Sequence, residues 1–350
     1  MIKILKLLLY PFAALYNLGT AIRNYLYDIG HKSSFEFETT VITVGNLNVG
    51  GSGKTPMVEY LIQLLKKNFA LATLSRGYRR QTKGYRIAES SDTARSIGDE
   101  PFQLFRKFGN EIKVVVGEDR VFAIPNILQE FPDTNVILLD DALQHRSVKP
   151  QLCVLVTDCA HPFYKDFVMP FGRLRESRRG SRRSDIIVVT KCKESLSLKE
   201  QEEMALAIQQ YAGEKPVFFT GIRYHKPQPV GSQELLTQNV ILVSGIAKNE
   251  SLKVFCHSNY TILKHFNYPD HHPYTVNDMI EIEAFCKIQS QPFSIITTEK
   301  DMVKLLAPEL KPYLTSLPWF YLPIEQFFLQ HGLKFDDLIF RAVKNAAETK

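Results

Sequence analysis

The fold is decided by the stretch Asn48-Val49-Gly50-Gly51-Ser52-Gly53-Lys54-Thr55, which lies between a strand-like run at 39–44 and a helix-like run at 57–67. A strand, a glycine-rich turn and a helix in this order direct backbone N–H groups, and the positive end of a helix dipole, at the phosphates of a nucleotide. Lys54 is expected to reach the β- and γ-phosphates, and Thr55 to hold Mg²⁺ through its hydroxyl. The stretch therefore predicts a nucleotide site.

One position departs from the usual G-x-x-x-x-G-K-[ST] pattern of a phosphate-binding loop. Asn48 stands where the first glycine is expected, although Gly50 and Gly51 still give the turn its conformational freedom. A glycine- and serine-rich surface turn beside an unrelated Lys-Thr pair is the alternative. The flanking strand and helix favour the phosphate loop.

Length and composition favour two domains in a reducing compartment. The chain has 350 residues, of which 45% are hydrophobic, enough for one large core or two ordinary ones. Its five cysteines form no C-x-x-C pair and lie mostly in apolar runs, which argues against a disulfide framework and a zinc site. The net charge of +6 is moderate and does not by itself require a nucleic-acid partner.

The first 34 residues are expected to form a membrane-associating helix region. The run Leu7 to Ala21 carries no charge but is too short to span a bilayer, and it contains Pro11. Basic residues flank it at Lys3, Lys6, Arg23 and Lys32. An amphipathic helix in the headgroup region is one interpretation, and a helix packed on the protein's own core is the other. The two can coexist.

Beyond the phosphate loop the pattern alternates between strands and helices, which predicts a doubly wound parallel α/β sheet. Strands are expected at 70–75, 113–116, 136–139, 152–157 and 185–190, and helices at 101–108 and 123–130. The expected organisation is a P-loop NTPase-like domain at 35–215, a proline-rich linker at 216–230 and a smaller α/β domain at 231–350. The sequence does not decide on which domain the last helix, 335–347, packs.

Two adjacent acids, Asp140 and Asp141, follow the apolar strand at 136–139. Ligands of open α/β sheets bind at the carboxyl ends of strands, and Mg²⁺ prefers oxygen ligands. The pair is therefore a candidate metal site. The alternative is a helix N-cap followed by a solvated acid.

Two short motifs contain candidate acid–base groups. Gly98-Asp99-Glu100-Pro101 is an acidic turn before a helix, so one carboxylate could cap the helix while the other points at a substrate. Asp270-His271-His272 could be structural, bind metal or form a proton relay. Neither motif decides its own role.

An arginine-dense run at 172–183 contains six arginines and is expected to form a polar loop. Guanidinium groups bind phosphate in a bidentate manner, so an anionic substrate or a lipid headgroup is one interpretation. A solvated basic loop is the other. No aromatic residues are interleaved, which disfavours a stacking platform for single-stranded nucleic acid.

Together these motifs resemble the bacterial tetraacyldisaccharide 4′-kinases, the lipid A 4′-kinases, over roughly residues 35 to 305. The resemblance runs through 44–56, 74–78, 98–101, Asp140-Asp141-Ala142-Leu143-Gln144-His145, 172–176, 266–272 and 298–301, in the order of the family. Asn48 is compatible with the loop of this family. Ala142, where many members have glycine, and the arginines after Glu176 are departures.

The resemblance implies transfer of the γ-phosphate of ATP to the 4′-hydroxyl of tetraacyldisaccharide 1-phosphate. It implies Asp99 as the base, assisted by His271, with Lys54 on the phosphates and Mg²⁺ held by Thr55, Asp140 and Asp141. It also implies contacts to the lipid substrate by Arg76, Glu100, Gln144, His145 and Arg175. Since His271 lies in the expected second domain, closure between domains is expected to assemble the Asp99–His271 pair. The expected location is peripheral, on the cytoplasmic face of the inner membrane.

Two other functional classes remain open. A nucleotide switch would share the phosphate loop, but guanine specificity usually needs an Asn/Thr-Lys-x-Asp turn, and Lys193 ends the corresponding segment 190–193. An ATP-driven nucleic-acid-binding protein could use the arginines and would bind DNA or RNA in a salt-dependent manner. With the resemblance in view, no nucleic-acid partner is expected.

Overall fold

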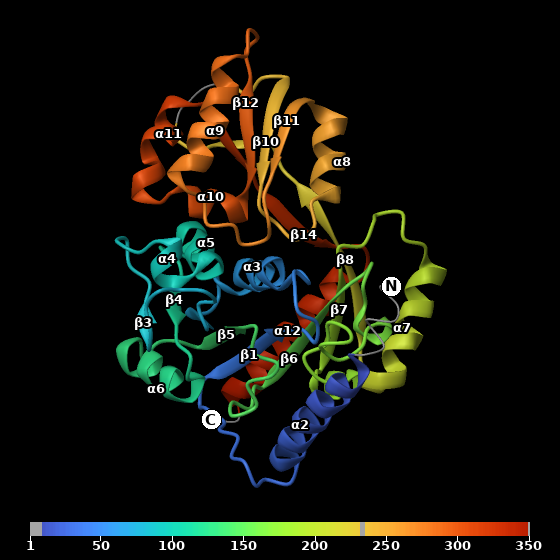
Figure 1. Ribbon diagram of the computed structural model, residues 1–350. Coiled ribbons are helices and arrows are strands. Elements are labelled where there is room, and N and C mark those ends of the chain that lie inside the picture. Colours follow the sequence, from blue (N-terminus) through green and yellow to red (C-terminus); the bar gives the residue numbers. More distant parts are fainter. Residues whose placement is uncertain (1–8, 232–234, 349–350) are drawn as a thin grey trace. The chain divides into compact units, whose positions relative to one another are not determined.

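The computed structural model describes residues 9–231 and 235–348, so the expected flanking charges Lys3 and Lys6 lie outside the described residues. The chain divides into two compact units. Unit 1 comprises Met1–Arg76, Asn110–Ile222 and Gln326–Lys350, and unit 2 comprises Gly77–Gly109 and Arg223–Glu325. Figure 1 labels most elements of both units.

Unit 1 is built on a parallel sheet, which confirms the predicted P-loop NTPase-like α/β class. Its strands are β1 (Thr40–Gly45), β2 (Leu71–Ser75), β4 (Lys113–Val116), β5 (Val136–Asp140), β6 (Leu152–Asp158), β7 (Ile186–Thr190), β8 (Val217–Tyr224) and β14 (Ile324–Phe328). They follow the order β14-β8-β7-β6-β1-β5-β2-β4. Central strands β1, β5, β6 and β7 are buried at every residue, as sequences covered on both faces by helices require.

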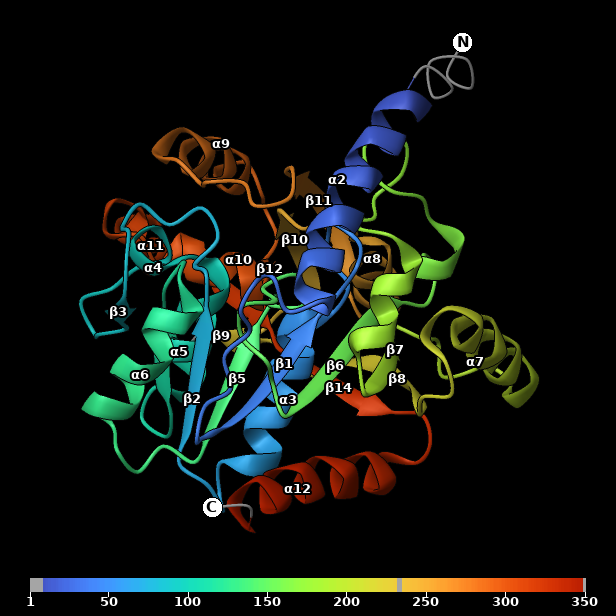
Figure 2. The same cartoon turned by 90° about the horizontal axis from the view of Figure 1, so that it is seen from below.

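The helices of unit 1 are α2 (Tyr10–Asp28), α3 (Lys54–Leu65), α6 (Arg120–Glu130), α7 (Leu198–Ala212) and α12 (Gly332–Glu348), with short 3₁₀ turns η1 (Phe163–Lys165) and η2 (Arg178–Arg183). The C-terminal helix α12 packs against β1 along one side of the sheet (Figure 2). Phe335, Ile339 and Val343 are buried at helical spacing, and the Phe335 ring lies 5.4 Å from that of Phe218. The last helix thus packs within unit 1.

Helix α2 is unusual because it attaches to unit 1 through polar side chains. Ala13 is its one buried residue among those described. Leu15, Leu18, Ile22 and Tyr25 are spaced by three or four residues, so they share one face, and each is more than half exposed. Among the helices of the described residues, none is long and apolar enough to cross a membrane.

Unit 2 contains a second, smaller sheet in the order β11-β10-β12-β13-β9. Its strands are β9 (Gln228–Pro229), β10 (Asn239–Ser244), β11 (Thr261–Asn267), β12 (Ser294–Thr298) and β13 (Trp319–Leu322), and β3 (Arg86–Ile87) lies in the 77–109 segment. Its helices are α4 (Ala94–Ile97), α5 (Asp99–Phe108), α8 (Glu250–Asn259), α9 (Val276–Lys287), α10 (Glu299–Leu305), η3 (Pro308–Leu310) and α11 (Lys311–Ser316). β10 pairs in parallel with β11 and β12, and β9 pairs antiparallel with β13.

The limits of the two units differ from the expected domains at 35–215 and 231–350. Residues 77–109 group with unit 2 because α5 packs against α10, where Lys107 pairs with Glu299 at 3.1 Å. Residues 326–350 group with unit 1 through α12. Each unit is therefore assembled from segments that are distant in the sequence.

Candidate active site

The phosphate loop joins β1 to α3 in a conformation that its small residues allow. Gly53 has φ of 86°, and a Cβ atom there would lie 3.0 Å from the Thr190 hydroxyl oxygen. The Asn46 amide donates hydrogen bonds to the Asn48 carbonyl, at 2.6 Å, and to the Ser52 hydroxyl, at 2.7 Å. Hydrogen bonds between its own residues thus stabilise the loop. Lys54, which follows Gly53, is the first residue of α3.

Asn48 has a structural use that a glycine could not serve. Its amide donates to a carboxylate oxygen of Asp166 at 2.9 Å, and its backbone bridges to Leu174. The next N–H, that of Val49, donates to the Arg173 carbonyl at 2.8 Å. The departure from the standard pattern therefore fastens the phosphate loop to the arginine-dense segment.

Lys54, Asp141 and Arg175 form an ion cluster beside the loop. Lys54 Nζ lies 3.7 Å from Asp141 Oδ1, and the Arg175 guanidinium donates to both oxygens of Asp141 at 2.8 and 3.0 Å. Burial would raise the pKa of Asp141, but the charges of Lys54 and Arg175 outweigh it and hold that pKa below its ordinary value. Asp141 is thus an ionised carboxylate that pairs with two cations.

The oxygen donors near Lys54 fit Mg²⁺. Asp140 is the last residue of β5 and is 3% exposed, directly before Asp141, and the Thr55 hydroxyl lies next to Lys54 on α3. Within the described residues no three His, Cys, Asp or Glu side chains form a metal cluster. Mg²⁺ commonly binds one or two carboxylates and completes its shell with water and substrate phosphates, so this donor set suits it.

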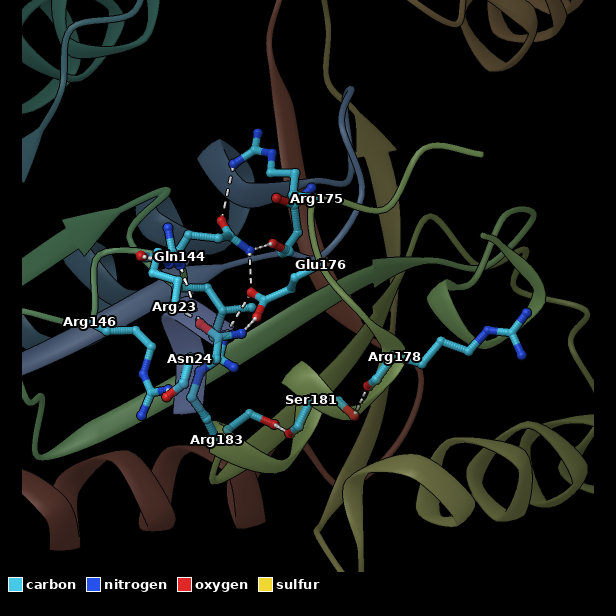
Figure 3. Close-up of polar contacts among 12 residues, drawn as sticks. Arg23, Asn24, Gln144, Arg146, Arg175, Glu176, Arg178, Ser181 and Arg183 are labelled. Atoms are coloured by element: carbon cyan, nitrogen blue, oxygen red, sulfur yellow. Dashed lines mark hydrogen bonds and ion pairs between the residues drawn. The ribbon is translucent and has the colours of Figure 1, made fainter. Parts of the chain in front are cut away.

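Behind this cluster, Glu176 joins three parts of unit 1 (Figure 3). Its carboxylate is 1% exposed and accepts hydrogen bonds from Asn24 of α2 at 2.8 Å, from Gln144 at 3.0 Å and from Arg183 at 2.7 Å. Burial would raise the pKa of Glu176, but Arg183 and these hydrogen bonds hold it below its ordinary value. The sequence did not predict this role of Glu176. The one signal for it was the position of a single acidic residue among six arginines.

Helix α2 also contacts the expected substrate residues directly. The Tyr16 hydroxyl donates to the Arg175 carbonyl at 3.0 Å, and Arg23 donates to the Gln144 carbonyl at 3.1 Å. Arg146 donates to the Asn24 carbonyl at 2.7 Å, within the group drawn in Figure 3. The N-terminal helix is thus attached to the loop that carries Gln144 and to Arg175.

The arginine-dense segment is only partly the polar loop that was expected, because much of it folds as η2 and several of its arginines are paired. Arg178 lies over the rings of Phe167 and Tyr211, at 5.0 and 5.4 Å from their centroids. Arg182 donates to the Tyr211 carbonyl at 3.3 Å. Local sequence could not show these partners, because Tyr211 lies on α7.

His145 lies in a cationic part of unit 1. Burial, followed by the charge of Arg120, lowers the pKa of His145 to about 4, so its imidazole is neutral near pH 7. Arg120 is 4% exposed, and burial together with the nearby charge of Arg76 lowers its pKa. Arg120 is a second residue that sequence reasoning missed, since it reads as an ordinary first residue of α6.

The remaining candidates lie together in unit 2. His271 Nδ1 is 3.1 Å from Asp99 Oδ2, and Glu100 pairs with Lys300 at 3.6 Å. Because Asp99 and His271 belong to the same compact unit, no closure between domains is needed to bring them together. The expectation of such a closure was wrong, since it assumed that 77–109 belongs to the unit of the phosphate loop.

The neighbouring His272 has a different environment. Its ring stacks on Tyr268, with centroids 4.4 Å apart, and its Nε2 lies 3.0 Å from Asp278, the residue that completes the capping box of α9. These contacts give His272 a structural role. His271 is therefore the histidine of this motif that faces the candidate base.

A parallel sheet with a glycine-rich loop between β1 and α3, and an acid pair at the end of β5, defines the class of P-loop phosphotransferases. The chain belongs to the tetraacyldisaccharide-1-P 4′-kinase family, whose model matches residues 5–343. It is accordingly a kinase, a phosphotransferase with an alcohol group as acceptor.

Individual relatives agree over the whole length of the chain. A protein of Flavobacterium johnsoniae named tetraacyldisaccharide 4′-kinase is 39% identical, covering 99% of both chains. A protein of the same name from Flavobacterium psychrophilum is 41% identical, covering 98% of each. The crystal structure of LpxK from Aquifex aeolicus in complex with ATP has a TM-score of 0.77 and 28% identity, and covers 97% of this chain and 99% of that one.

Proposed function

We propose that this protein transfers the γ-phosphate of ATP to the 4′-hydroxyl of tetraacyldisaccharide 1-phosphate, a step in lipid A biosynthesis. The observation that carries the proposal is the phosphate loop, in which Lys54 begins α3 beside Asp141. It occurs in a chain that matches enzymes of that name from end to end.

The phosphate-binding residues act by positioning and charge neutralisation, which is most of what phosphoryl transfer asks of a protein. Backbone amides of residues 50–55 cradle the phosphates, and Lys54 contacts the β- and γ-phosphates, while the Val49 amide fastens the loop to Arg173. Thr55, Asp140 and Asp141 would hold Mg²⁺, which supplies positive charge to the phosphate oxygens when bound. Asp141 also keeps Lys54 and Arg175 in place, since it pairs with both.

The acceptor hydroxyl must lose its proton, and Asp99 accepts it. His271 holds the Asp99 carboxylate through the hydrogen bond at 3.1 Å. The lipid substrate is bound by Arg76, Glu100, Gln144, His145 and Arg175. The guanidinium groups of the two arginines suit the 1-phosphate, and the Gln144 amide and the neutral His145 imidazole suit sugar hydroxyls.

The protein works at a membrane surface, on the cytoplasmic face of the inner membrane. The apolar face of α2, with Leu15, Leu18 and Ile22 more than half exposed, is suited to the boundary between headgroups and acyl chains. Its opposite side is attached to unit 1 by polar contacts, so a helix that rests on unit 1 could at the same time present this face to lipid.

The test is incubation with ATP, Mg²⁺ and tetraacyldisaccharide 1-phosphate, followed by mass spectrometry for one added phosphate. Lys54→Ala and Asp99→Ala should each reduce the rate by about a hundredfold or more. Lys66→Ala, which removes a cation at the other end of α3, should keep full activity. Absence of product from the wild type, or ATP turnover stimulated by RNA or DNA instead of the lipid, would refute the proposal.

A further inference from the structure

His271 has a charged neighbour that the proposed mechanism does not use. Lys300, on α10, places its Nζ 3.2 Å from His271 Nε2, while the other ring nitrogen faces Asp99. Both contacts lie within unit 2. The imidazole therefore lies between a carboxylate and an ammonium group.

The two neighbours together decide where the ring carries its proton. An ammonium group has hydrogen-bond donors and no acceptor, so Nε2 must offer its lone pair to Lys300. A carboxylate only accepts, so Nδ1 must carry the hydrogen that is shared with Asp99. The arrangement fits one form of His271, the neutral Nδ1–H tautomer.

The surrounding charges explain why a lysine is needed for this. The groups that face His271 are Asp99 of α5, Asp270 of the preceding loop, Lys300 of α10, and the Tyr78 ring at 5.5 Å, while Glu100 of α5 faces Lys300. Without the ammonium, both ring nitrogens would face carboxylates, because Asp270 Oδ2 lies 3.7 Å from Nε2, and a hydrogen on either nitrogen would have an acceptor. The ammonium at Nε2 makes the two nitrogens different.

Lys300 is held in place for this purpose. Its ammonium lies 3.6 Å from Glu100 Oε1 and 3.7 Å from Asp270 Oδ1, and its side chain is 25% exposed. Two carboxylates from different segments thus fix the direction of a long side chain that would otherwise be free to rotate. The ammonium stays on the Nε2 side of the ring.

We propose that Lys300 is a positioning residue that keeps His271 as the neutral Nδ1–H tautomer, so that His271 donates to Asp99 and Asp99 alone accepts the substrate proton. This inference rests on the proposed function for its catalytic meaning. In the step, the hydroxyl O–H bond breaks and its proton goes to Asp99, the oxygen forms a bond to the γ-phosphorus, and ADP leaves with the electrons of the broken P–O bond.

The tautomer is measured directly by ¹⁵N–¹H correlation spectra of the full-length protein labelled at histidine, with His271→Gln used to assign the signal. The wild type should show a proton on Nδ1 and none on Nε2 at neutral pH. In Lys300→Met, which removes the ammonium donor from Nε2, a proton signal should appear on Nε2. Lys300→Arg should restore the wild-type pattern. Lys107→Met, which removes a cation that pairs with Glu299 of α10, should leave the His271 signals unchanged.

The kinetic arm uses the same variants. Lys300→Met should lower kcat by about tenfold or more with KM for ATP unchanged, and Lys300→Arg should recover most of the loss. A proton on Nε2 in the wild type, or a His271 spectrum unchanged in Lys300→Met, would overturn the inference. Failure of the wild type to phosphorylate the lipid would instead overturn the proposed function, because the spectra report the tautomer without turnover.

Discussion

Gly53 shows how one residue sets the shape of the phosphate loop. Gly53→Ala places a side chain at φ of 86° and brings its Cβ within 3.0 Å of Thr190, whose hydroxyl donates to the Ser52 carbonyl. We expect a loss of about 1–3 kcal/mol of stability from the strain and at least a tenfold loss of ATP affinity, measured by calorimetric titration.

The matched control is Gly213→Ala. Gly213 has a similar φ of 81° but no atom within 4 Å of its would-be Cβ. Gly213→Ala should lose stability through backbone strain while binding ATP normally. Equal ATP affinity in both variants would show that the loop tolerates displacement of Thr190.

His145 gives a prediction for pH. Its pKa is about 4 in the folded protein and near 6.5 in an unfolded chain, so the unfolded state binds more protons between these values. The free energy of unfolding should therefore fall as pH drops from about 6.5 to 4. The difference between the folded and unfolded pKa values corresponds to a loss of about 3 kcal/mol of unfolding free energy at most. Solvent around the partly exposed ring makes the loss smaller.

Urea unfolding at several pH values measures this effect. His145→Gln should remove that part of the acid sensitivity, whereas His31→Gln, at an exposed histidine, should retain it. Identical pH profiles for the wild type and His145→Gln would contradict the assignment.

At the scale of single residues, the sequence predicted those site residues that belong to a short motif with characteristic spacing. Lys54 and Thr55 follow from the loop pattern, and the structure brings Asp99 and His271, two separately ambiguous motifs, within hydrogen-bond distance. Glu176 could not be found, because Asn24, one of its partners, is 152 positions away. Arg120 could not be found, because its burial and the nearby charges of Arg76 and Asp141 appear only in the folded chain. Which cation neutralises which acid is decided by tertiary contact.

At the scale of elements, α2 combines an apolar outer face with polar attachment. Replacing Leu15, Leu18 and Ile22 together by serine should reduce binding to anionic lipid vesicles by at least tenfold, because each apolar side chain contributes to burial in the interface. ATP affinity should not change. Vesicle flotation and nucleotide titration measure the two properties.

The control for this variant is the pair Leu198→Ser and Leu206→Ser on α7, which are 58% and 64% exposed. These changes remove exposed leucines without altering α2, so vesicle binding should persist. Equal loss of binding in both would mean that general surface hydrophobicity, and not α2, carries the protein to lipid.

Most elements could be predicted from periodicity, because buried parallel strands read as continuous apolar runs. The strand expected at 113–116 has those bounds in the structure, and the strands expected at 136–139 and 152–157 each end one residue later. The arginine-dense segment was harder, since its order comes from Phe167, Tyr211 and Glu176, and charged runs carry no periodic signal for such packing.

At the scale of the whole molecule, the last helix completes unit 1. Phe335 of α12 is fully buried, and its ring lies 4.6 Å from that of Phe328 and 5.9 Å from that of Tyr60. Phe335→Ala should lower the free energy of unfolding by about 3–5 kcal/mol, measured by urea unfolding. Leu333→Ala, at a side chain that is 83% exposed, should change it little.

The division into units was the least predictable feature. A linker rich in proline suggested a single boundary near residues 216–230, and contiguous domains follow from that assumption. The structure instead assigns 77–109 to unit 2, where α5 meets α10 across nearly two hundred residues of sequence. A proline-rich composition indicates a turn or a linker. It cannot show that a segment early in the sequence packs against a segment that comes much later.

This order of segments has a consequence for how the protein is made. When residues 77–109 leave the ribosome, the stretch 223–325 that they pack against has not been translated, and the first unit lacks its final piece until 326–350 has been synthesised. Neither half can finish folding on a nascent chain. A gene cut at the proline-rich stretch would therefore encode two fragments that each lack part of their own interior, and both should require co-expression to become soluble.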